Sequence, residues 1–86
     1  MSRNQLHYIE NEPIIYEYGK VFINDFYISV MPTPNRESVI VDILDQGRKL
    51  EFKKGDALVL SDKTTRIEFT GIAINGIRLT INTKWG

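Results

Sequence analysis

The sequence contains no cysteine and a single histidine, His7. Without cysteine the chain has no disulfide framework, no zinc site with thiolate ligands and no cysteine nucleophile. One imidazole is too few for a histidine-rich metal site. His7 also lies in a polar N-terminal stretch, where we interpret it as a solvated side chain rather than a catalytic base. We therefore expect no bound metal.

The sequence also offers few groupings of residues that could form a catalytic site. No serine occupies a strand–turn–helix elbow of the kind that exposes a nucleophile. The acidic residues Glu10, Glu12 and Glu17 are typical of a solvated surface or a protected sheet edge. The segment Lys53–Asp56 lacks both the glycine spacing and the following helix of a phosphate-binding loop. The sequence therefore predicts a non-catalytic protein without a cofactor.

Long apolar runs are missing too. None approaches the roughly 20 residues that a membrane helix needs, and the N-terminus lacks the basic-then-apolar pattern of a signal peptide. We expect a cytoplasmic protein with no membrane partner. The 86 residues suffice for one domain with a small core, so we also expect the chain to associate with copies of itself.

The chain is rich in β-branched side chains. Isoleucine, valine and threonine supply 23 of the 86 residues, whereas alanine supplies two. Branched side chains lose rotamer freedom in helices and pack well on pleated strands. We predict an all-β protein: an N-terminal arm over residues 1–12, either loose or forming an irregular edge, and one domain over residues 13–86. The domain is expected to be a small antiparallel barrel or sandwich of about six to eight short strands, with an intertwined dimer as one form of self-association.

Glycine, proline and polar residues separate the expected strands. Asn75-Gly76 predicts a type I′ hairpin turn, and Gly71 predicts a bulge. Residues 21–30 form either two strands joined by a turn at Asn24-Asp25 or one long bent strand. The expected strands cover residues 14–18, 21–23, 26–30, 39–44, 50–52, 57–60, 66–74 (interrupted at Gly71) and 77–81.

The zero net charge conceals a division of charge along the chain. Residues 1–45 carry a net charge of −4 and residues 46–86 carry +4. This asymmetry indicates either a basic binding face or two halves that attract each other. Phe52 and Phe69 lie among the cations, where they either pack in the core or stack on unpaired bases. The candidate nucleic-acid-binding residues are Lys49, Lys53, Lys54, Arg66, Arg78 and Lys84.

Tyrosines gather in the acidic half of the chain, and tyrosine is enriched at protein interfaces. A tryptophan near the C-terminus suits the cap of a barrel, an interface between copies, or base stacking. The candidate partner-interface residues are Tyr16, Tyr18, Tyr27 and Trp85.

The segment from residue 50 to residue 82 has a basic pair before a Gly-acid step, an apolar strand, an aspartate, an alternating strand ending in glycine, and an apolar-Arg-apolar strand ending in asparagine. In this order of residues it resembles the carbon storage regulator family. The similarity covers 33 of the 86 residues and needs one extra residue between Asp62 and Gly71. The matching residues are Leu50, Lys53, Gly55, Asp56 (for a glutamate), Leu58, Leu60, Asp62, Gly71, Asn75, Arg78 and Asn82.

The resemblance implies a dimeric β-protein that binds messenger RNA, often at GGA in hairpin loops, and controls translation. The basic residue that this family carries before the glycine corresponds to Lys53. Phe52 stands where the family has a second arginine, and no counterpart follows Asn82 for the family's next strand and helix. We therefore predict an RNA-binding translational regulator. The alternative is a protein-interaction module or inhibitor, of the kind encoded by phages or other mobile elements, that docks on a host protein through its acidic, tyrosine-rich half.

Overall fold

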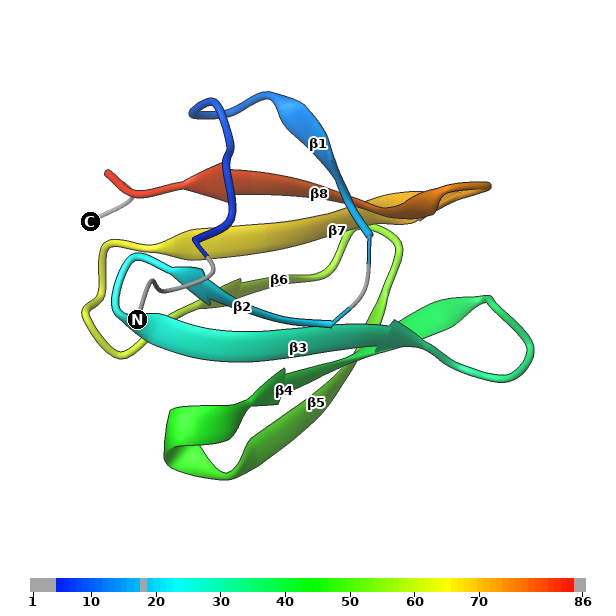
Figure 1. The fold of residues 1–86 in the computed structure, drawn as a ribbon, viewed down its shortest axis with the longest axis horizontal. Helices are drawn as coiled ribbons and strands as arrows, with labels where there is room; N and C mark the ends of the chain where they lie inside the picture. Colours follow the sequence, from blue (N-terminus) through cyan, green and yellow to red (C-terminus); the bar gives the residue numbers. More distant parts are fainter. Residues whose placement is uncertain (1–4, 18, 85–86) are drawn as a thin grey trace.

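The structure, a computed structural model, describes residues 5–17 and 19–84. Over these residues it contains two four-stranded antiparallel sheets, with strand orders β1-β8-β7-β6 and β2-β3-β4-β5 (Figure 1). The predicted all-β fold is therefore confirmed. The strands are β1 (Pro13–Tyr16), β2 (Lys20–Ile23), β3 (Phe26–Pro32), β4 (Ser38–Ile43), β5 (Arg48–Lys53), β6 (Ala57–Val59), β7 (Arg66–Ala73) and β8 (Gly76–Asn82).

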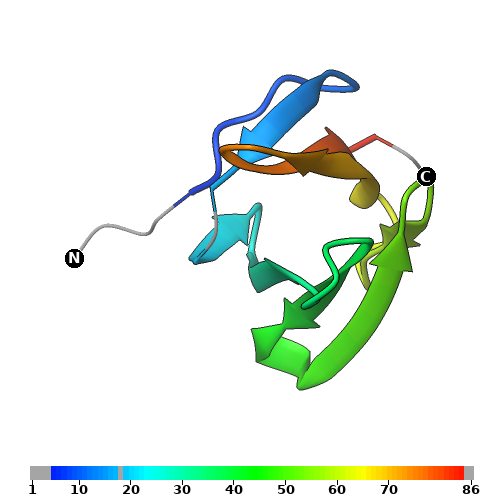
Figure 2. The ribbon, with the colours of Figure 1, turned by 90° about the vertical axis from the view of Figure 1, so that its right-hand side faces the viewer.

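The core lies between the two sheets, which enclose it in the view of Figure 2. Alternate residues of each long strand point inward, and the inward side of β8 carries the buried trio Ile77, Leu79 and Ile81, as the alternation predicts. Phe52 and Phe69 are buried in the same core, so these rings are packing residues rather than stacking platforms. Full burial of one such aliphatic or aromatic side chain contributes about 1.5–3 kcal/mol to folding.

Two turns test predictions made from the sequence, and the first confirms that residues 21–30 form two strands joined by a turn. Residues 20–32 form the β2–β3 hairpin, with Asn24 at a positive φ of 55° in its turn. The prediction of a type I′ turn with Asn75 and Gly76 as its two central residues is wrong. Ala73 pairs with Gly76, so the two-residue loop is Ile74-Asn75, and neither residue has a positive φ.

Glycine is needed at position 76 for a different reason. A Cβ atom there would collide with the carbonyl oxygen of Tyr16 and lie 2.9 Å from the Ile15 side chain. The glycine thus allows the end of β1 to approach the start of β8. The bulge expected at Gly71 is confirmed by a register shift between Phe69 and Gly71.

The described part of the N-terminal segment, residues 5–12, is irregular and lies against both sheets. The Leu6 amide donates to the Phe22 carbonyl of β2 at 2.9 Å, and the Asn11 amide donates to the Ile81 carbonyl of β8 at 3.0 Å. The side chain of Leu6 also packs against the core. Of the two expectations, these residues match the irregular edge.

Candidate binding face on the β2–β5 sheet

The outward face of the β2-β3-β4-β5 sheet follows from the side-chain alternation of β4. Val39, Val41 and Ile43 are buried, so Ile40 and Asp42 point away from the core. The strand register then aligns outward residues in rows across the sheet. One row consists of Lys20, Ser29, Asp42 and Lys49, and the next consists of Met31, Ile40 and Glu51.

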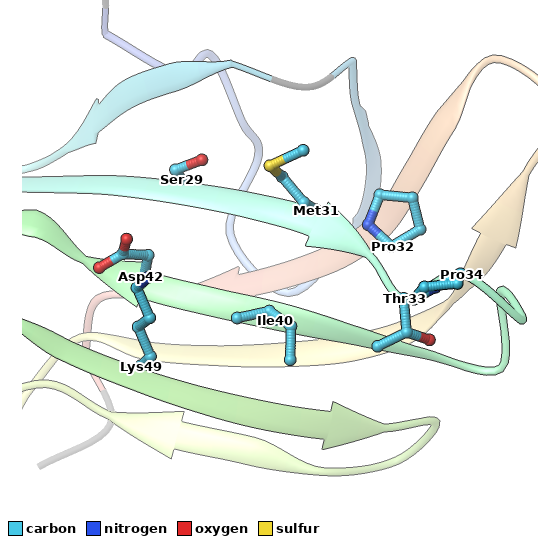
Figure 3. Close-up of a pocket in the computed structure, with 8 residues that line it drawn as sticks. All are labelled: Ser29, Met31, Pro32, Thr33, Pro34, Ile40, Asp42 and Lys49. Atoms are coloured by element: carbon cyan, nitrogen blue, oxygen red, sulfur yellow. The ribbon is translucent and has the colours of Figure 1, made fainter.

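Residues of these two rows on β3, β4 and β5 border a surface hollow of about 440 Å³, which Lys20 and Glu51 do not line. Figure 3 shows its lining side chains on β3, β4 and β5 and on the loop that follows β3. Met31, which is 59% exposed, and Ile40 provide apolar surface, and the opposite charges of Asp42 and Lys49 lie at the other end. The full lining is Ser29, Met31, Pro32, Thr33, Pro34, Ile40, Asp42 and Lys49.

The wall formed by residues 32–34 makes hydrogen bonds to β4 and within its own loop. The Thr33 amide donates to the Ser38 carbonyl at 3.0 Å, and the Thr33 hydroxyl donates to the Asn35 side-chain oxygen at 2.8 Å. Ser38 in turn donates its hydroxyl to the Glu51 carboxylate at 2.7 Å. The loop that contains Pro34 is therefore joined to the sheet by hydrogen bonds and forms one side of the hollow.

An aromatic pair continues the same face toward the β2–β3 turn. The rings of Phe22 and Tyr27 are stacked with centroids 4.6 Å apart and planes inclined by 24°. The Tyr27 amide donates to the Asp45 carboxylate at 3.0 Å, which ties β3 to the 3₁₀ turn Leu44–Gln46 (η1). The face thus combines ordered aromatic, aliphatic and charged groups.

The six candidate nucleic-acid-binding cations do not gather in one place. Lys49, Lys53 and Lys54 are exposed on β5 and in the turn after it. Arg66 and Arg78 lie on β7 and β8 of the other sheet, and Lys84 follows β8. Inward residues alternate with these arginines, so the two groups of cations point outward from different sheets.

Acidic side chains lie next to several of these cations and offset their positive charge. Arg66 donates to the Glu68 carboxylate at 3.0 Å. Lys53 and Lys54 border a second hollow of about 520 Å³ whose lining includes Glu37 and Glu51. The two carboxylates offset the two ammonium groups, so this hollow has no excess of positive charge.

The candidate partner-interface tyrosines have different positions. Tyr16 is 1% exposed, so its assignment to a partner surface is corrected. It is a core residue whose hydroxyl donates to the Gly19 carbonyl and accepts from the Val30 amide at 3.1 Å, and burial raises the pKa of this phenol. Tyr27 lies half-exposed on the candidate face, whereas Tyr18 and Trp85 lie outside the described residues.

A polar network joins the loop before β7 in one sheet to the β2–β3 turn of the other sheet. Buried Thr65 donates its hydroxyl to Asp62 at 2.6 Å and accepts from the Asn24 side-chain amide at 3.0 Å. Partial desolvation disfavours ionised Asp62, but hydrogen bonds from Thr65 and Thr64 outweigh it and lower the pKa of Asp62 to about 2. The network fixes the β2–β3 turn, which borders the candidate face.

Sequence reasoning missed Met31 and Ile40. The strand expected over residues 26–30 ends before Met31, whereas β3 continues through Pro32. The exposed apolar character of Met31 and Ile40 depends on the register between β3 and β4, where the two residues are partners. The sequence shows that Met31 and Ile40 are apolar, but it does not show that they are neighbours on an exposed face unless the strand pairing is known.

Comparison with protein-family models, with curated proteins and with solved structures found no match to this chain. Among residues 5–17 and 19–84, no group of three or more histidine, cysteine or acidic side chains could hold a metal ion. The same residues include no helix with the length and apolar character to cross a membrane.

Proposed function

We propose that this protein is a non-catalytic interaction domain that binds another protein through the outward face of its β2-β3-β4-β5 sheet. The observation that carries the proposal is the ordered hollow bordered by Met31, Ile40 and the 32–34 loop. An apolar centre surrounded by polar groups is an arrangement found in protein-binding sites.

The chemistry of the hollow indicates what the partner presents. An aliphatic or aromatic side chain would displace water from Met31 and Ile40, and methionine adapts its shape to such a group. The charges at Asp42 and Lys49 would orient the partner through groups of opposite sign. We therefore infer a partner surface with one protruding apolar residue next to a mixed pair of charges.

RNA binding is the weaker proposal. Exposed Lys53 and Lys54 favour it because cations attract phosphate. However, Arg66 and Arg78 lie on the other sheet, and Phe52, which stands where the carbon storage regulator family has a second arginine, is buried. A single strand of RNA would therefore meet only part of the expected cation set on either face.

Photo-crosslinking tests the protein-binding proposal. A photoreactive amino acid replaces Met31 in the full chain, which is then expressed in the cells that naturally contain it. We expect one dominant protein adduct, because Met31 borders the hollow and is exposed. Excess unmodified protein should suppress that adduct, and the additional change Ile40→Glu should reduce its yield about tenfold or more.

Ile74 provides the matched control. It is an exposed apolar residue at the tip of the β7–β8 hairpin, in the other sheet. A photoreactive group there should not yield the same adduct. Equal adducts from positions 31 and 74, or an adduct at position 31 that consists of RNA, would contradict the proposal.

A further inference from the structure

The two sheets have four edge strands, and β5 differs from the other three. β6 has three residues, and β1 has four and begins with Pro13. On β2 the Phe22 carbonyl already accepts a hydrogen bond from Leu6. β5 is six residues long, contains no proline and has no register shift against β4. Of the devices that protect sheet edges, β5 therefore has only charged side chains, which a partner strand of complementary charge can accommodate.

The backbone groups on the open side of β5 can be assigned. The amide of Lys53 donates to the Asp56 carboxylate at 2.8 Å, and its carbonyl accepts from the Asp56 amide at 2.8 Å. Both groups of Lys53 therefore point away from β4. Because backbone orientation alternates along a strand, the amides and carbonyls of Lys49 and Glu51 point the same way. In residues 5–17 and 19–84 none of these four groups has a hydrogen-bond partner.

Of the antiparallel pairings of β5 with a second β5, only the one centred on Leu50 bonds all four groups to residues of the second strand. A pairing centred on Leu50 sets Lys49 of each copy opposite Glu51 of the other. The amide and carbonyl of Lys49 then point toward those of Glu51, and the two residues exchange two hydrogen bonds. A pairing centred on Glu51 opposes two like charges. One centred on Phe52 needs the backbone groups of Lys53, which Asp56 already occupies.

Side-chain charge selects the same register. Lys49 and Glu51 both point outward from the sheet, so the Leu50-centred pairing opposes an ammonium group to a carboxylate twice. Opposite charges at directly opposed positions stabilise a sheet, whereas like charges destabilise it. The half-buried side chains of the two Leu50 residues would meet at the symmetry axis on the core-facing side.

We propose that the chain forms a symmetric dimer by antiparallel pairing of its β5 edges, centred on Leu50. The two β2-β3-β4-β5 sheets then form one continuous sheet of eight strands. This inference is argued from the β5 edge and does not need the partner proposed for the outward face, although Lys49 borders both surfaces.

A charge-reversal series tests the register. Sedimentation of the full chain should show a dimer. Lys49→Glu opposes two carboxylates, and Glu51→Lys opposes two ammonium groups, so each variant should weaken dimerisation about tenfold or more. An equimolar mixture of the two variants should restore a dimer that contains one copy of each. The double variant should dimerise by itself, and Lys54→Glu serves as the control that leaves dimerisation unchanged.

Cysteine crosslinking tests the axis, because the native chain has no cysteine. Opposed residues of a non-hydrogen-bonded pair have Cα atoms about 4.5 Å apart, which is within the range of a disulfide. Leu50→Cys should therefore form a crosslinked dimer under mild oxidation, whereas Glu51→Cys and Phe52→Cys should not.

Several results would overturn the dimer. A monomer at every accessible concentration would do so, as would single charge variants that dimerise like the native chain or fail to recombine when mixed. Preferential crosslinking at position 51 or 52 would refute the register. Protection of the Lys49 and Glu51 amides from hydrogen exchange only when a different protein is added would assign the edge to another occupant.

Discussion

Tyr16 and Asp62 show how single polar groups connect the two sheets. The Tyr16 hydroxyl lies between the Gly19 carbonyl and the Val30 amide, so β1 is joined to β3 of the other sheet. Asp62 holds Thr65, whose hydroxyl reaches the β2–β3 turn at Asn24. Both residues are polar, and the hydrogen bonds they make connect parts of the fold.

Replacement of Tyr16 by phenylalanine should lower the free energy of unfolding by about 1–3 kcal/mol, because the buried Val30 amide loses its partner. Urea denaturation measures the change. Tyr27→Phe is the control, since Tyr27 is half-exposed, and its effect should remain within about 0.5 kcal/mol. Equal stability of the two variants would refute the role assigned to the Tyr16 hydroxyl.

Asp62 should make stability sensitive to acid. Its pKa falls from 3.8 to about 2 in the folded protein, so its carboxylate stabilises the fold above about pH 4 and loses that effect as the pH falls through 2. Asp62→Asn cannot accept the Thr65 hydroxyl bond through its amide nitrogen and should cost about 1 kcal/mol at pH 7.

Thermal unfolding of the native chain and of Asp62→Asn, measured from pH 6 to pH 2, checks this expectation. The difference between the two proteins should be constant above pH 4 and shrink below it. A difference that grows as the pH falls would show that the carboxylate is not held in its ionised form.

At the scale of elements, much of β7 and β8 could be predicted from the sequence. Alternating apolar residues fix which side of each strand is buried, and a glycine in the middle of β7 signals its bulge. The turn between them could not be predicted. Gly76 is a glycine because the end of β1, about 60 residues earlier in the chain, leaves no room for a Cβ atom there. A local dipeptide carries no information about that distant strand.

Gly76→Ala should therefore destabilise the protein by about 1–3 kcal/mol, since the new methyl group collides with the Tyr16 carbonyl. Hydrogen exchange should accelerate most at the amides of β1. Asn75→Ala changes the neighbouring residue, which needs no positive φ, and should alter stability by less than about 0.5 kcal/mol. A larger loss of stability in Asn75→Ala would contradict this account and would support a type I′ turn at Asn75-Gly76.

At the scale of the whole molecule, the fold separates what the sequence places together. The basic half of the chain spans β5 in one sheet and β6, β7 and β8 in the other, so its cations point outward in two directions. The sequence could predict that the chain is all-β, because a period of two is a local signal. It could not predict the candidate face, because Met31 and Ile40 become neighbours only through the register of β3 against β4.

The central claim is that this protein binds through an apolar hollow rather than through a basic surface. Titration of the labelled chain with mixed-sequence single-stranded RNA at low salt, followed by amide chemical shifts, tests it most directly. We predict weak shifts without saturation, scattered near cations of both sheets. Saturable shifts that include Lys53, Lys54 and Arg78 together, with an affinity that falls as salt rises by a slope of about −0.7 per phosphate contact, would contradict the claim.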